Sequence, residues 1–198
     1  MVSQRGEVDT MKSNYEDRAT KFAQKIIPWF MFCDTLNDFE EAICVYNSCH
    51  SRPLFYAHGV SRIAIIRSDY VVKFDFTPIG SFANGIAGDI DSEQKVYAKA
   101  VSAHMEHLLA KTTVKEYHGR KYSIMPRING IGREDRYWRG YCTSEEYDWL
   151  CNNINDLHEH NVGYRNGKVC VIDYAWDADQ EEEEEEESYE PSIFSGAW

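Results

Sequence analysis

Apolar residues spaced three and four positions apart predict two helices in the first 50 residues. Residues 1–12 are expected to form a flexible leader, and a capping box beginning at Ser13 should start a helix that runs to about Ile27. Pro28 and the aromatic residues around it separate this helix from a second one beginning near Asp34. The second helix places four apolar side chains on one face: Leu36, Phe39, Ile43 and Tyr46.

From Leu54 onward the pattern changes to the short runs typical of β-strands, separated by turn residues. Three strands are expected first, then a loose glycine-containing connection, a helix from about Asp91 to Leu109, and a final pair of strands joined at His118-Gly119. The five strand runs are 53–57, 62–66, 70–74, 112–117 and 121–125. Five mostly antiparallel strands with one helix after the third predict an α+β fold.

The last third of the chain contains one further helix and one strand. Residues 130–140 are polar and rich in turn formers, which predicts an exposed loop. A second capping box, from Thr143 to Glu146, should introduce the helix. A short strand is expected over residues 168–172, with Asp173 at its end. The apolar positions of the helix are Tyr147, Leu150, Cys151, Ile154 and Leu157.

Composition fits a soluble, cytosolic protein. The chain has 198 residues with 43% hydrophobic content, enough for one domain of two small lobes. No apolar run approaches the roughly 20 residues needed to cross a bilayer, and the N-terminus lacks the apolar segment of a signal peptide. The six cysteines show no metal-binding or redox spacing, so free and mostly buried thiols are expected.

The formal net charge of −12 is concentrated near the C-terminus. Eleven acids and no Lys or Arg follow Lys168, and removing those eleven from the 33 acids leaves 22 against 21 basic residues. Direct nucleic-acid binding by a basic face is therefore not expected. The run Glu181 to Glu187 is either a solubilising tail, a lure for a protein partner with a basic surface, or an autoinhibitory segment that repels nucleotide.

Five polar residues stand out by their order and spacing along the chain. Lys73 lies in the strand Tyr70-Val-Val-Lys-Phe, and Glu93 lies early in the following helix. Asp156 and Asn161 are five residues apart in Asp156-Leu-His-Glu-His-Asn161, and Asp173 follows the next strand. The set, which spans roughly 60% of the chain, resembles the protein-kinase-like superfamily. The form of the motifs around Asp156, Asn161 and Asp173 is similar to that of small phage-encoded kinase-like proteins and aminoglycoside-kinase relatives.

This resemblance implies a fold, two cofactors and a role for each residue. The implied fold is a five-stranded N-lobe sheet with one helix and a reduced, mainly helical C-lobe. The cofactors are ATP and Mg²⁺. Lys73 would hold the α- and β-phosphates, Glu93 would orient Lys73, and Asp156 would act on the acceptor hydroxyl. Asn161 and Asp173 would coordinate the metal. Gly59, Ser61 and Arg62 would form the phosphate-binding loop.

The same resemblance divides the chain into four parts. Residues 1–50 would be a helical extension, 51–128 the N-lobe, 129–178 a truncated C-lobe and 179–198 an acidic disordered tail. The phosphate loop has one glycine, Gly59, where the family has three. Ile154-Asn155 replaces the usual His-Arg, so control by a phosphorylated activation loop is not expected. Asp173-Tyr174-Ala175 lacks the family's final glycine.

Two functions remain open at this stage. The first is a minimal ATP- and Mg²⁺-binding protein that acts as an atypical serine/threonine kinase or phosphotransferase on a host protein. The second is a catalytically inactive, pseudokinase-type viral interaction protein that uses its acidic tail to bind and inhibit a host factor in the host cytoplasm. Histidine pairs at His104 and His107 and at His158 and His160 are interpreted as structural rather than metal-binding.

Overall fold

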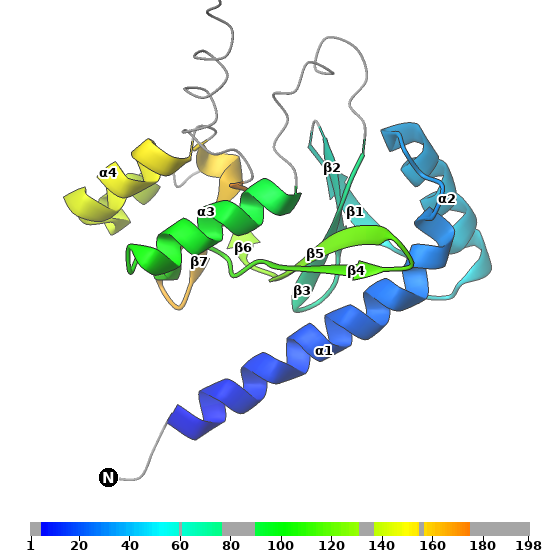
Figure 1. Ribbon diagram of the computed structural model, residues 1–198, viewed down its shortest axis with the longest axis horizontal. Coiled ribbons are helices and arrows are strands. Elements are labelled where there is room, and N and C mark those ends of the chain that lie inside the picture. The colour runs from blue at the N-terminus through cyan, green and yellow to red at the C-terminus, as the bar shows by residue number, and fades with distance from the viewer. Residues whose placement is uncertain (1–4, 60, 77–89, 131–136, 155–156, 175–198) are drawn as a thin grey trace, which may run out of the picture.

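A computed structural model describes residues 5–59, 61–76, 90–130, 137–154 and 157–174 (Figure 1). Its first element, α1 (Arg5–Phe30), begins well before the predicted start and contains Ser13 in its interior. The flexible leader and the Ser13 capping box are therefore wrong for residues 5–13. A helix that has formed extends residue by residue, and no proline interrupts it before Pro28. Pro28 itself lies inside α1, which ends two residues later.

The second predicted helix is confirmed as α2 (Leu36–Cys49). Unlike the box expected at Ser13, a capping box is present at the start of α2. The Thr35 hydroxyl accepts from the Asp38 N–H, and the Asp38 carboxylate accepts from the Thr35 N–H at 2.8 Å. Three of the four predicted face residues are buried, while Leu36 is partly buried against the same core.

Five antiparallel strands form one sheet in the order β1-β2-β3-β5-β4. The strands are β1 (Phe55–His58), β2 (Arg62–Ile66), β3 (Tyr70–Asp75), β4 (Thr113–Tyr117) and β5 (Arg120–Pro126). The turn between β4 and β5 has φ of 52° at His118 and 79° at Gly119, as a tight two-residue hairpin requires. The predicted α+β fold with a five-stranded antiparallel sheet is confirmed.

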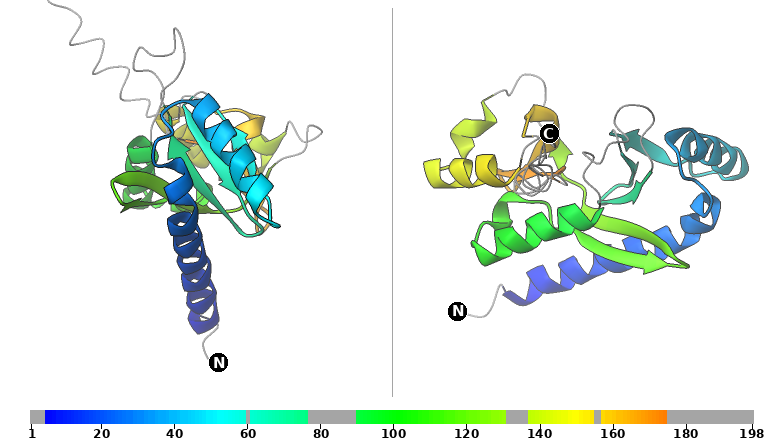
Figure 2. Two further views of the ribbon diagram at one scale, coloured as in Figure 1. Left: turned by 90° about the vertical axis from the view of Figure 1, so that its right-hand side faces the viewer. Right: turned by 45° about the horizontal axis from the view of Figure 1, so that its top comes forward.

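The two faces of this sheet have different neighbours because side chains alternate along each strand. One face carries Ile63, Ile65, Val72, Phe74, Tyr122 and Ile124, which share a buried core with α1 and α2. Helix α1 runs along the sheet (Figure 1), and the two further views show α2 following it (Figure 2). The opposite face carries Arg62, Lys73 and Ser123, whose side chains contact Glu93 of α3 (Ile90–Ser102). The polar site is thus on the face away from α1.

Helix α3 ends at Ser102, seven residues before the predicted end at Leu109. His104 has a φ of 60°, and its N–H donates to the Val101 carbonyl at 3.2 Å. The Met105 N–H donates to the Ala100 carbonyl at 2.8 Å. These two bonds form a Schellman motif with histidine in the left-handed position where glycine is usual, so the termination signal was not visible in the sequence. A short 3₁₀ helix, η2 (Glu106–Leu108), follows.

A second, three-stranded sheet was not predicted. It joins β6 (Asn129–Gly130), β7 (Val162–Arg165) and β8 (Lys168–Val171) in antiparallel pairs. The turn between β7 and β8 is Asn166-Gly167, with φ of 55° and 76°. An Asn-Gly pair between short apolar runs is a strong hairpin signal, and that signal was available in the sequence.

Helix α4 (Ser144–Asn153) has the predicted capping box, in which Thr143 and Glu146 bond each other's backbone N–H groups at 2.7 and 3.2 Å. Its predicted apolar face is only partly correct. Leu150 and Ile154 are buried, but Cys151 is exposed and Leu157 lies beyond the helix end. The predicted exposed loop is wrong at Trp138, which is buried in the 3₁₀ helix η3 (Trp138–Tyr141).

Two main cores and a small third cluster hold the fold together. The second core gathers side chains of α3, α4, β7 and β8. The third consists of Ala110, Met125 and Cys170, and the Ala110 N–H donates to the Val171 carbonyl at 2.8 Å. The first core includes α1 and α2 as well as the sheet. The proposed division into four parts stays a prediction.

All six cysteines are free, as expected, but their burial differs from the expectation. Cys33 and Cys170 are buried, Cys142 is partly buried, and Cys44, Cys49 and Cys151 are exposed. Within the described ranges, no helix has both the length and the apolar character needed to span a membrane.

Candidate functional site

Lys73 lies at the centre of a charged cluster on the α3-facing side of the sheet. Its ammonium Nζ is 2.6 Å from Glu93 Oε1 and 3.6 Å from Asp173 Oδ1, and it donates to the Ile172 carbonyl at 3.0 Å. The side chain is buried, and its cross-strand neighbours are the small residues Ala64 and Ser123. The sequence prediction that Lys73 and Glu93 lie together is therefore met in the geometry.

Glu93 is in the first turn of α3 and is completely buried, at 0% exposure. Its carboxylate accepts from Lys73, from the Ser123 hydroxyl at 3.5 Å and from Arg62 Nη1 at 3.4 Å. The start of α3 is fixed by Asp75, whose Oδ2 accepts from the Ile90 N–H at 3.2 Å. A buried carboxylate is tolerated only with such partners, and the two cations and the hydroxyl compensate for the burial of Glu93.

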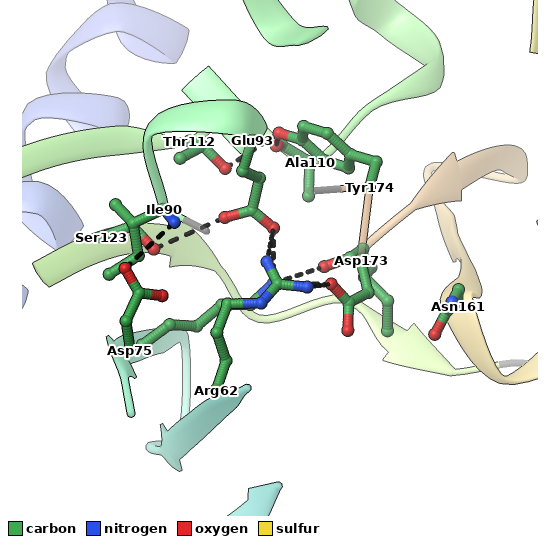
Figure 3. Close-up of polar contacts among 12 residues, drawn as sticks. Arg62, Asp75, Ile90, Glu93, Ala110, Thr112, Ser123, Asn161, Asp173 and Tyr174 are labelled. Atoms are coloured by element: carbon green, nitrogen blue, oxygen red, sulfur yellow. Dashed lines mark hydrogen bonds and ion pairs between the residues drawn. The ribbon is translucent and has the colours of Figure 1, made fainter. Parts of the chain in front are cut away.

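Arg62 brings a second cation into the cluster. Its side chain is 13% exposed and forms an ion pair through Nη2 with Asp173 Oδ1, in addition to the contact with Glu93. Burial alone would lower the pKa of this guanidinium, but the charges of Glu93, Asp173 and Asp75 outweigh burial and raise the pKa. Figure 3 shows the guanidinium between the Glu93 and Asp173 carboxylates.

The other two residues assigned to the phosphate loop lie apart from this cluster's ion pairs. Gly59 is at the exposed turn between β1 and β2, where its N–H donates to the Arg62 carbonyl at 2.9 Å. A Cβ added to Gly59 would meet no atom within 4 Å. The Ser61 carbonyl accepts from the Phe76 N–H at 2.8 Å. Both residues therefore lie in the connection that leads into Arg62.

Asp173 follows β8 and brings the second sheet to the cluster. Burial would raise the pKa of its carboxyl, but Lys73 and Arg62 outweigh that effect and hold the pKa below its ordinary value. The side chain is 37% exposed, so one side of the carboxylate still faces solvent. Asp173 is thus the most exposed of the four charged side chains in the cluster.

Asn161 lies beside Asp173 because their segments are paired. It ends the 3₁₀ helix η4 (Glu159–Asn161), and its carbonyl accepts from the Ile172 N–H at 2.8 Å. Its side-chain nitrogen is 3.3 Å from His158 Nε2, and the His158 ring also accepts from the His160 N–H. Figure 3 shows Asn161 on the side of Asp173 away from Arg62.

Asp156, the residue predicted to act on the acceptor hydroxyl, lies outside the described residues, as do Gly80, Gly85, Gly88 and the run Glu181 to Glu187. The chain on either side of Asp156 is anchored. Ile154 is buried at the end of α4, and Leu157 packs against the second core.

The side-chain oxygens of Asp173 and Asn161 are ligands of the kind that a hard divalent cation prefers. A carboxylate and an amide are ligands that Mg²⁺ accepts while it keeps several waters. Within the part of the chain that the structure describes, no three His, Cys, Asp or Glu side chains gather closely enough to hold a metal ion. Asp173 and Asn161 could supply two oxygen ligands to a metal whose other ligands are water and phosphate.

Three contributors to the site were missed in the sequence, although two of them carried a signal. Asp75 is two residues after Lys73 and so lies on the same face of β3. Ser123 is a small polar residue inside the apolar strand β5. Tyr174 is buried in the second core, where its hydroxyl donates to the Ala110 carbonyl and lies 2.9 Å from Thr112 Oγ1. No local pattern indicated that last contact.

The order of elements and the convergence of Lys73, Glu93 and Asp173 are those of a kinase-like fold, as the sequence predicted. No family model matches the chain, and no curated protein matches it. The similar solved structures include a complex of WbdD with the kinase inhibitor LY294002, at 16% identity and a TM-score of 0.37. A structure of the bifunctional kinase-methyltransferase WbdD has 15% identity and a TM-score of 0.38.

A third similar structure is the Legionella pneumophila kinase Lpg2603 bound to IP6, at 12% identity and a TM-score of 0.36. The matches cover 61–63% of this chain and between 33% and 46% of those three chains. The chain thus spans less than half the length of these structures. At such low similarity the site residues are assigned from their own geometry.

Proposed function

We propose that this protein binds a nucleoside triphosphate, with ATP as the first candidate, together with Mg²⁺. The convergence of three elements on Lys73 supports the proposal. The buried ammonium contacts Glu93 from α3, Asp173 from the end of β8 and the Ile172 carbonyl, so one cation and one partly exposed carboxylate stand next to each other. A fixed cation beside a metal-binding carboxylate is the arrangement that phosphate binding requires.

Each residue has a distinct task in this proposal. Lys73 binds the α- and β-phosphates, and Glu93 keeps its ammonium aimed at them. Asn161 and Asp173 hold Mg²⁺, which neutralises phosphate charge when it is bound. Asp156 accepts or orients the proton of an acceptor hydroxyl, which makes the protein a minimal phosphotransferase. None of these roles requires a covalent intermediate with the protein, because phosphoryl transfer depends mainly on positioning and electrostatic stabilisation.

A pseudokinase is the second candidate, and the Arg62–Asp173 ion pair favours it. Two cations already contact the carboxylate on which metal binding depends. A protein that keeps the scaffold but holds nucleotide weakly would serve as an interaction module, and its acidic tail would bind a host protein with a basic surface. Under this proposal the protein acts in the cytoplasm of the host of a virus or phage.

Nucleotide binding is tested by thermal unfolding with and without ATP and Mg²⁺. The wild-type midpoint should rise with both ligands present, and Asp173→Asn and Asp173→Ala should lose most of that rise. Asp17→Ala, at an exposed position of α1, is the control and should respond like wild type. A wild-type protein with no ligand-dependent rise at millimolar ATP and Mg²⁺ would refute the proposed function.

Labelled ATP separates the two candidates. Phosphate transfer to the protein itself or to an added protein should occur with wild type and disappear in Asp156→Ala. If the protein binds ATP but wild type and variant are equally inactive, the pseudokinase is supported. A complex with a basic partner should then weaken with added salt and on deletion of residues 180–198.

A further inference from the structure

The charges around Asp173 are close to balanced without a metal ion. Two cations, Arg62 and Lys73, contact the carboxylates of Glu93 and Asp173, and the charge of a third carboxylate, Asp75, also acts on Arg62. Adding a divalent cation to such a set without an anion would leave excess positive charge in a partly buried place, which is unfavourable. Adding the cation together with a polyphosphate restores the balance.

Of the two cations, Lys73 is the one held more firmly by partners other than Asp173. Lys73 is held by Glu93 at 2.6 Å and by the Ile172 carbonyl at 3.0 Å, whereas Arg62 reaches Glu93 at only 3.4 Å. The Arg62 ion pair with Asp173 is on the partly exposed carboxylate. A guanidinium has five N–H donors in a planar fork, which suits a phosphate as well as a carboxylate.

The backbone of Arg62 is fixed, so only its side chain can move. Arg62 is the first residue of β2 and pairs with Asp75 of β3, and its carbonyl accepts from the Gly59 N–H at 2.9 Å. Asp75 also stabilises the charge of the guanidinium. A rotation of the side chain away from Asp173 therefore needs no change in the sheet.

We propose that Arg62 is a built-in cation that holds Asp173 in the place of a metal ion and transfers to the phosphates when the metal and nucleotide bind together. The inference rests on the proposed nucleotide site and adds its regulation. Divalent metal alone binds weakly because Arg62 competes with it for Asp173. A polyphosphate relieves the competition by accepting the guanidinium, so metal and nucleotide bind with positive coupling.

Manganese binding tests this directly, since free Mn²⁺ is counted by electron paramagnetic resonance and needs no activity. Wild type should bind Mn²⁺ alone weakly and much more tightly with a non-hydrolysable ATP analogue. Arg62→Gln should bind Mn²⁺ alone about tenfold more tightly than wild type, and its gain from the analogue should shrink by about the same factor. Asp173→Asn should lose Mn²⁺ binding in both backgrounds.

Arg62→Lys is the second variant, because it keeps the charge but offers fewer donors, and it should give Mn²⁺ affinity between wild type and Arg62→Gln. Circular dichroism establishes that each variant is folded. If Arg62→Gln does not fold, Arg62→Lys decides, and Mn²⁺ affinity equal to wild type would overturn the proposal. Equal Mn²⁺ affinity of folded Arg62→Gln and wild type would overturn it too. Wild type that binds neither metal nor analogue would instead overturn the proposed function.

Discussion

Asp173 and Tyr174 are consecutive residues whose side chains enter opposite environments. The Asp173 carboxylate is partly exposed and paired with Lys73 and Arg62. The Tyr174 side chain is buried in the second core, where its hydroxyl bonds the Ala110 carbonyl and Thr112. Because the two residues share one backbone link, the position of the site carboxylate depends on the packing of the ring behind it.

Removing the Tyr174 hydroxyl should destabilise the protein without changing its shape. Tyr174→Phe leaves the buried Thr112 hydroxyl and the Ala110 carbonyl without their shared partner, so the free energy of unfolding should fall by about 1–2 kcal/mol. Urea denaturation measures the change. Tyr137→Phe removes a hydroxyl from a side chain that is 81% exposed and should change little. Equal stabilities of the two variants would contradict the assigned bonds.

The buried Lys73–Glu93 pair should show strong energetic coupling. Lys73→Met leaves the fully buried Glu93 with Arg62 at 3.4 Å as its remaining cationic contact and should cost about 3 kcal/mol, with Glu93→Gln costing a similar amount. The double variant should be more stable than the sum of the single losses predicts.

The control for this cycle is the exposed pair of Lys111 and Glu16, which has the similar distance of 2.7 Å but a lysine that is 49% exposed. Lys111→Met should cost less than about 1 kcal/mol. If Lys73→Met were as mild as Lys111→Met in urea denaturation, burial would not be what makes the central pair important.

The β7–β8 hairpin should depend on the glycine of its Asn166-Gly167 turn. Gly167 has a φ of 76°, which strains any other residue, so Gly167→Ala should lower the free energy of unfolding by about 1 kcal/mol. Gly140→Ala is the matched change, because an added Cβ there also meets no atom within 4 Å and the backbone needs no left-handed conformation. Thermal unfolding of the two variants should differ, and a match between them would argue against the tight turn.

Cysteine labelling should divide the thiols into two groups. Burial raises the pKa of Cys33 and Cys170 to about 11, so these buried thiols are neutral at pH 7.5 and poorly nucleophilic. Iodoacetamide should modify the exposed Cys44, Cys49 and Cys151 in the native protein, and Cys33 and Cys170 only after denaturation. Peptide mass spectrometry identifies each site. Rapid native labelling of Cys170 would mean that the small cluster around Ala110 opens readily.

The sequence predicted the parts of the fold that follow from local patterns. The apolar run Tyr70-Val-Val-Lys-Phe placed Lys73 in a strand, and the capping box at Thr143 placed the start of α4. What it could not predict depended on distant contacts. Arg62 and Asp173 are 111 residues apart, and no spacing rule relates them. The end of α3 was missed because histidine took the left-handed position of a glycine.

The small cluster of Ala110, Met125 and Cys170 has a consequence for dissecting the chain. Lys73 and Glu93 precede residue 128, whereas Asn161 and Asp173 follow it, and the two halves meet where the Ala110 N–H bonds the Val171 carbonyl. A fragment cut at 128 would therefore carry either the cations or the oxygens proposed to bind the metal, never both. Mixing the two fragments would therefore test their association, because ligand binding should return only when the two fragments assemble.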